Sequence, residues 1–169
     1  MTVVLVGNPR PASRTRAVAE TVASRVAARL GVDDGLTTID LADIAGQLFA
    51  AERRDVDAAL AAVADARLLV VATPVYKASY TGLLKSFLDL YGPAGLAGVD
   101  AIPVVVSASP GHAGAGDRYL LPLLVELGAR VPRRALAVLE SQLGDVERIV
   151  DEWDGTPLVP AASVVPRVG

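Results

Sequence analysis

The segment GNPRPASRTR, residues 7–16, combines residue types that bind phosphate groups, and it follows directly on an apolar run. Gly7 permits a sharp turn. Ser13 or Thr15 can cap a following helix, whose free backbone amides then face any anion. Two arginines beside such amides suit a phosphate, because a guanidinium pairs with phosphate oxygens in a bidentate manner. The alternative is a rigid loop with an ordinary helix cap and solvated arginines.

The type of phosphate follows from what residues 7–16 lack. They contain neither the three spaced glycines of a dinucleotide-binding turn nor the lysine-containing phosphate loop of nucleoside triphosphatases. We therefore favour a mononucleotide phosphate over a pyrophosphate or a triphosphate.

A second candidate segment, ATPVYKASYTGLLKSFLDLY at residues 72–91, contains the only two lysines of the chain and four of its seven aromatic residues. Thr73 precedes a proline and therefore avoids helical backbone, so a strand is expected to end there. Val75 and Tyr76 then offer a small apolar surface with backbone amides, which suits the edge of a flat ring.

The helix expected at 81–91 is apolar on more than one face. A second apolar stripe consists of Tyr80, Leu84, Phe87 and Tyr91. One face is enough for packing on a sheet, so this stripe predicts burial against another subunit. The alternative is that these aromatic residues thicken the core of a monomer.

A third candidate segment, SASPGHAGAGD at residues 107–117, contains His112, the only histidine of the chain. A lone histidine in a glycine-rich loop is more often solvated than catalytic, and one imidazole does not make a metal site. His112 is a candidate because of its position near the edge of the sheet where ligands are expected.

The elements that must position these segments follow from an alternation of two patterns. Apolar runs occur at 3–6, 36–41, 68–73, 102–108 and 135–139. Amphipathic helical patterns occur at 16–30, 56–66, 81–91, 117–127 and 145–153. Strands that are apolar throughout are covered on both faces, which predicts an α/β fold with a doubly wound, five-stranded parallel sheet and helices on both faces. In the common flavodoxin-like strand order, ligands bind after strands one, three and four.

Length and composition limit the remaining possibilities. The 169 residues fit one domain, expected at 1–154, followed by a Pro-containing C-terminal tail at 155–169. The apolar runs are too short to cross a bilayer, and the chain has no cysteine. A net charge of −3 argues against nucleic acid as a partner. The first residues do not form a secretory signal, so we expect a cytoplasmic protein.

Three segments resemble the NAD(P)H-dependent FMN reductase family, which is flavodoxin-like. They are GNPRPASRT, ATPVYKASYTGLLKSFLDL, and His112 placed four residues before GDRYLLPLLVELGA. The chain is most similar to the flavin reductases that serve two-component monooxygenases of the alkanesulfonate type. The resemblance runs from about residue 3 to residue 140.

The resemblance implies three sets of FMN-binding residues. The FMN phosphate would be held by Arg10, Ser13, Arg14 and Thr15, and Asn8, which replaces the usual serine, would hydrogen-bond near the phosphate. The ribityl chain and the ring would lie along Pro74, Val75, Tyr76 and Lys77. The other ring edge would be contacted by Ser109, Pro110, Gly111 and His112. Ser107 and Ala108 replace glycines that are common in the family, so they could crowd the flavin.

The resemblance also implies a function. NADPH or NADH would donate a hydride to FMN, with no catalytic acid, base or metal from the protein, and the reduced flavin would supply a monooxygenase. The chain would form a homodimer or homotetramer, with Tyr80 in a π-bulge at the interface. The alternatives are an FMN-bound quinone, azo-dye or chromate reductase, an electron-carrying flavodoxin, and a non-catalytic nucleotide-binding module.

Overall fold

The structure is a computed structural model, and it describes residues 1–31 and 35–154. The predicted tail at 155–169 therefore lies outside the described residues. Within these ranges, no helix is both long enough and apolar enough to span a bilayer.

Five parallel strands form one sheet. They are β1 (Thr2–Val6), β2 (Leu36–Asp40), β3 (Leu68–Pro74), β4 (Asp100–Ser107) and β5 (Leu136–Leu139). Their order is β2-β1-β3-β4-β5, which confirms the predicted flavodoxin-like topology. β1, β3 and β4 are buried along most of their length, as expected of a sheet covered on both faces, and β5 alternates buried and half-buried residues. β2 lies at an edge of the sheet, with Leu36 and Thr37 exposed and Asp40 buried.

Helices connect the strands. The α-helices of the described ranges are α1 (Arg14–Arg29), α2 (Leu41–Ile44), α3 (Arg54–Ala64), α4 (Gly82–Leu88), α5 (Leu121–Glu126) and α6 (Val146–Asp154). Shorter 3₁₀ turns are η1 (Ala45–Gln47), η2 (Pro110–His112) and η4 (Glu140–Asp145), and η3 (Gly116–Leu120) is a π-helical turn.

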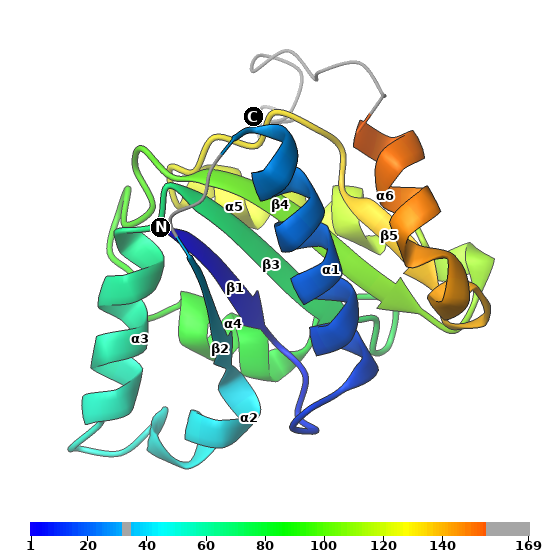
Figure 1. The fold of residues 1–169 in the computed structure, drawn as a ribbon. Helices are drawn as coiled ribbons and strands as arrows, with labels where there is room; N and C mark the ends of the chain where they lie inside the picture. Colours follow the sequence, from blue (N-terminus) through cyan, green and yellow to red (C-terminus); the bar gives the residue numbers. More distant parts are fainter. Residues whose placement is uncertain (32–34, 155–169) are drawn as a thin grey trace, which may run out of the picture.

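Helices cover both faces of the sheet (Figure 1). Val4 and Val6 of β1 pack with the buried side of α1 and with α6. Val3 and Leu5, which alternate with them, pack in a second core with α3, α4 and α5. This alternation follows from the two-residue period of a strand. Because the strands are parallel, the carboxyl ends of β1, β3 and β4 lie side by side. We call this end of the sheet its carboxyl edge.

The stripe predicted to face another subunit is largely buried within the chain. Leu84 and Phe87 have no exposed surface, so they cannot form a subunit contact. The Tyr91 hydroxyl donates a hydrogen bond to the carbonyl oxygen of Leu60 at 2.8 Å, and burial raises the pKa of this phenol. For these side chains the structure supports the alternative, a thicker monomer core.

The π-bulge expected at Tyr80 is also absent from that helix. Tyr80 precedes α4, whose N-cap is Thr81, and α4 is a regular α-helix. The π-helical turn is η3, which follows β4 and contains the exposed Tyr119. A Cβ added to Gly116 would lie 2.5 Å from the Cβ of Ala135, so this turn packs tightly against the segment that enters β5.

Candidate functional site

The loop after β1 is anchored to β3 and to the start of α4. The amide of Gly7 donates to the carbonyl oxygen of Ala72 at 2.7 Å, and the carbonyl of Gly7 accepts from Thr81 Oγ1 at 2.6 Å. A Cβ on Gly7 would lie 2.6 Å from the Cβ of Leu84, so only glycine allows this close approach. The first and second candidate segments, which follow β1 and β3, are therefore joined directly.

Asn8 and Thr15 hold the shape of the loop from inside. Both are buried, and Asn8 Nδ2 donates to Thr15 Oγ1 at 3.0 Å. Asn8 Oδ1 also accepts the amide of Arg10 at 3.0 Å. These bonds tie the loop to the first turn of α1, so both residues support the predicted phosphate site from beneath its surface.

The first turn of α1 provides free donors beside the loop. Ser13 is the N-cap, and its Oγ accepts the amide of Arg16 at 3.3 Å. Among the described residues, the amides of Ser13, Arg14 and Thr15 have no hydrogen-bond acceptor. Such amides at the positive end of a 16-residue helix attract an anion.

The two predicted phosphate-binding arginines differ in their surroundings. Arg14 Nη2 forms an ion pair with Glu140 Oε2 at 3.2 Å. Arg10 is exposed and forms no ion pair within residues 1–31 and 35–154. Arg10 is therefore the cation of this loop whose charge remains available to a ligand.

Asp40 supports the same loop, although sequence reasoning did not select it. It is 4% exposed, and its carboxylate accepts the amides of Ala12 at 3.2 Å and Ala42 at 3.3 Å. Burial raises the pKa of Asp40, and the two amide bonds oppose that shift. Ala12 has a positive φ of 49°, a strained conformation that the bond to Asp40 helps to hold. The signal available in the sequence was the position of Asp40 at the end of an expected strand.

The loop after β3 turns back sharply over four residues. The amide of Val75 continues the sheet by donating to Val106 at 2.9 Å. Tyr76 and Ser79 then exchange two backbone hydrogen bonds, of 2.9 and 3.1 Å. Between them, Lys77 and Ala78 have φ values of 51° and 66°, as a type I′ turn requires, although neither is glycine. This strained turn exposes Tyr76, which is 44% accessible, at the edge of the sheet.

Thr81 connects the two loops. Its hydroxyl donates to Gly7 and accepts the amide of Leu84 at 3.2 Å, and its own amide donates to Thr73 Oγ1 at 3.2 Å. Thr81 is 2% exposed. One buried side chain therefore fixes the end of β3, the start of α4 and the loop after β1 relative to one another. The capping pattern of Thr81 is readable from sequence, but its bond to Gly7 is not.

The loop after β4 is stabilised by its own serines. Ser107 is buried, and its Oγ donates to the carbonyl oxygen of Ser109 at 2.8 Å and accepts the amide of Ser109 at 3.2 Å. The Ser109 hydroxyl accepts the amide of Gly111 at 3.3 Å. Ala108 and His112 are exposed. The hydroxyl of Ser107 is thus used within the loop.

A small hollow brings the last two loops together. It has a volume of about 90 Å³ and is lined by Ala78 of the turn after β3 and by Gly111, His112, Gly114, Ala115, Arg118 and Tyr119. The structure therefore gathers the three predicted segments at one edge. Arg10 and the free amides lie at one end of it, Tyr76 near the middle, and His112 at the other end.

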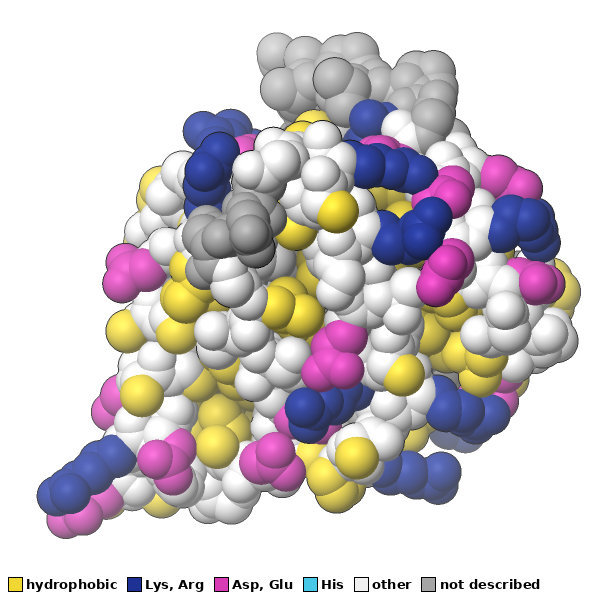
Figure 2. Space-filling view, in the orientation of Figure 1, with side chains coloured by type: hydrophobic (Ala, Val, Ile, Leu, Met, Phe, Trp, Pro, Cys, Tyr) yellow, Lys and Arg dark blue, Asp and Glu magenta, His cyan; other side chains and the backbone are white. Residues whose placement is uncertain are grey.

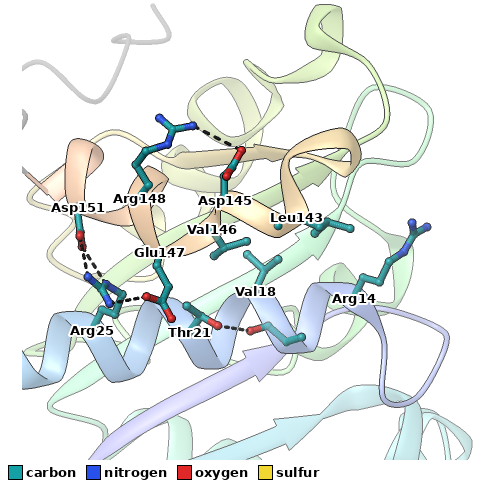
Figure 3. A pocket seen from close by; sticks show the side chains of 12 residues that line it. Arg14, Val18, Thr21, Arg25, Leu143, Asp145, Val146, Glu147, Arg148 and Asp151 are labelled. Atoms are coloured by element: carbon teal, nitrogen blue, oxygen red, sulfur yellow. Dashed lines mark hydrogen bonds and ion pairs between the residues drawn. The ribbon is translucent and has the colours of Figure 1, made fainter.

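A larger hollow of the described residues lies elsewhere, between α1 and α6 (Figure 3). Its volume is about 630 Å³, and its floor includes Val18 and Val146. Its charged rim is neutralised internally: Arg25 pairs with Glu147 and Asp151. Figure 2 shows the same interleaving of acidic and basic side chains over these two helices. No sequence-predicted residue except Arg14 lines this hollow.

Known proteins resemble most of the chain. The model of the NADPH-dependent FMN reductase family matches residues 1–143. The NADH-dependent FMN reductase SfnF of Pseudomonas putida is 31% identical over 95% of this chain and 95% of its own. The FMN reductase (NADPH) of Pseudomonas aeruginosa is 39% identical over 69% of this chain and 64% of its own.

A solved structure is similar to the same extent. The apo form of the NADH:FMN oxidoreductase EMOB superposes with a TM-score of 0.75 at 31% identity, covering 96% of this chain and 92% of that one. The superposition agrees with the flavodoxin-like topology described above. The chain belongs to the NADPH-dependent FMN reductase family.

Proposed function

We propose that the chain transfers a hydride from NADPH or NADH to FMN at the carboxyl edge of its sheet. The observation that carries the proposal is the arrangement of the three loops. An anion site of free amides and Arg10 lies after β1, and a partly apolar surface with Tyr76 lies after β3. FMN combines a phosphate at one end with a flat ring at the other, so its two ends match the two parts of this edge.

The residues have distinct roles in this proposal. Arg10 and the amides of residues 13–15 bind the FMN phosphate, while Asn8 and Thr15 hold their loop in place. Arg14 shares its charge with Glu140 and contributes less. Pro74, Val75, Tyr76 and Lys77 line the ribityl chain and the ring, and Ser109, Pro110, Gly111 and His112 line the far ring edge. The bound flavin supplies the hydride acceptor, and the protein positions it.

Family membership and the names of the relatives support this activity. Relatives of the chain include reductases named for NADH and others named for NADPH. The reduced flavin would supply a flavin-dependent monooxygenase. Mixing the protein with FMN and NADPH or NADH without oxygen should bleach the flavin absorbance. Unchanged flavin absorbance with both nucleotides would contradict the proposed activity.

We also propose that the chain forms a homodimer or homotetramer. Because Leu84 and Phe87 are buried, any surface on this segment must use its partly exposed side chains, such as Tyr80 and Leu83. Light scattering on the purified protein tests this. A monomeric mass at the concentrations used for assays would contradict it.

A further inference from the structure

Most arginine and lysine side chains of the described ranges are neutralised by carboxylates. Ion pairs bind the cations at positions 14, 16, 25, 29, 53, 85, 130, 133, 134 and 148. Within residues 1–31 and 35–154, the exceptions are Arg10, Arg54, Arg67, Lys77 and Arg118. A cation that lacks a carboxylate in a chain with an acid excess is available to an external anion.

Three of these exceptions lie on the three loops of the candidate site. Arg10 follows β1, Lys77 lies in the turn after β3, and Arg118 lies in η3 after β4. Arg67, in contrast, precedes β3, and its amide bonds to Met1, so it lies at the opposite edge of the sheet. The site residues assigned above include Arg10 and Lys77 but not Arg118.

The surroundings of Arg118 keep its charge unpaired. The neighbouring acid, Asp117, accepts the amide of Ala135 at 2.7 Å and forms an ion pair with Arg134 at 3.4 Å. Asp117 is thus held toward the start of β5. The amide of Arg118 donates to Gly114 at 3.1 Å, which fixes its backbone in η3. Its exposed side chain lines the small hollow together with His112 and Tyr119.

We propose that Arg118 binds a phosphate group of the nicotinamide dinucleotide, an inference that rests on the proposed function. In the proposed function, Arg10 and the free amides at the start of α1 bind the single phosphate of FMN. The dinucleotide brings further phosphates, which need a cation of their own. β1 and β4 flank β3, so their ends lie about 10 Å apart, at a strand spacing of ~4.8 Å. Arg118 is the unpaired cation on the β4 side of the edge.

The test compares Arg118→Ala and Arg118→Lys with Arg67→Ala, a change of an equally unpaired arginine at the opposite edge. Dissociation constants for NADP⁺ and NAD⁺ are measured by calorimetry in the presence of FMN, and KM values for NADPH, NADH and FMN by steady-state kinetics. Arg118→Ala should raise the dissociation constant and the KM of the dinucleotide by about tenfold or more, as loss of a charge-assisted hydrogen bond does. The KM of FMN should change much less, and Arg118→Lys should retain part of the affinity.

The outcomes distinguish the 2′-phosphate from the pyrophosphate as the ligand of Arg118. They also distinguish failure of this inference from failure of the proposed function. A larger effect on NADP⁺ than on NAD⁺ assigns Arg118 to the 2′-phosphate, and equal effects assign it to the pyrophosphate. An unchanged dinucleotide affinity, or a loss confined to FMN, overturns the inference even if the wild type reduces flavin. If the wild type does not turn over, the proposed function fails, and the calorimetric comparison still decides the role of Arg118.

Discussion

At the scale of single residues, the sequence predicted three candidate segments, which the fold brings to one edge of the sheet, but it could not distinguish the roles of their residues. Arg10 and Arg14 are equivalent in the sequence, and only the fold places Glu140 beside Arg14, 126 positions away. Asn8 and Thr15 were selected as ligand contacts, yet both are buried and bonded to each other. Asp40 and Arg118 were not selected, because their surroundings depend on contacts between distant segments.

This distinction predicts the effect of replacing Arg10. Arg10→Ala should weaken FMN binding by about tenfold or more, because a hydrogen bond from a charged group to a phosphate is lost. Arg14→Ala should weaken it less, since Arg14 is already paired. Quenching of flavin fluorescence measures both, with Arg67→Ala as the control. Equal losses for Arg10→Ala and Arg67→Ala would contradict this assignment.

Thr81 provides a second test at the residue scale. Thr81→Val keeps the shape of the side chain but removes the bonds of its hydroxyl to Gly7 and Leu84. Because these groups are buried, the free energy of unfolding should fall by about 1–3 kcal/mol. Thr21→Val, which removes an exposed hydroxyl bond to Ala17, should have a smaller effect in the same urea titration. Equal losses in the two variants would exclude the bridging role.

At the scale of elements, the sequence pattern predicted the strands and most helices. A strand buried on both faces is apolar throughout, and a helix packed on a sheet is apolar on one face. Periodicity misjudged the segment 80–91. An apolar surface around a helix has the same pattern whether a second subunit or the chain itself covers it, and here the chain covers Leu84 and Phe87. Periodicity did not predict the π-helical turn at Gly116–Leu120 either, where Gly116 packs closely against Ala135.

The close contact between Gly7 and Leu84 of α4 predicts that a methyl group added at Gly7 destabilises the fold. Gly7→Ala should lower the free energy of unfolding by about 1–3 kcal/mol, because the new Cβ would overlap Leu84. Gly46→Ala is the matched control, since no atom lies within 4 Å of its added Cβ. Chemical denaturation of both variants checks this, and a loss as large in Gly46→Ala would argue against the close approach.

The ion pairs between α1 and α6 predict a dependence of stability on pH. The hydrogen bond from Arg25 lowers the pKa of Asp151 below its ordinary value of 3.8. The folded state thus favours the ionised carboxylate, so the stabilisation is present above that value and is lost as the pH falls below it. The difference in unfolding free energy between wild type and Asp151→Asn should be larger at about pH 7 than at about pH 3. Asp65→Asn is the control, since Asp65 forms no ion pair in the described ranges, and a pH-independent difference for Asp151→Asn would contradict the linkage.

At the scale of the whole molecule, the sheet order and the convergence of three loops were predictable because the topology of parallel sheets obeys few rules. The residue pairs that fix the loops to one another were not predictable, because Thr81 and Gly7 are separated by 74 positions. The fold thus supplies what the motifs alone lack, a single edge on which the proposed phosphate site and the proposed ring surface lie together.

The most direct test of the proposed activity is the oxidation of NADPH and NADH in air by the purified protein, with FMN titrated from none to excess. The arrangement of the site predicts that oxidation depends on FMN and reaches saturation as the flavin site fills. If the rate rises with added FMN, flavin behaves as a substrate, and a yellow protein indifferent to added FMN holds it as a bound cofactor. The absence of oxidation of either nucleotide at every FMN concentration would contradict the account.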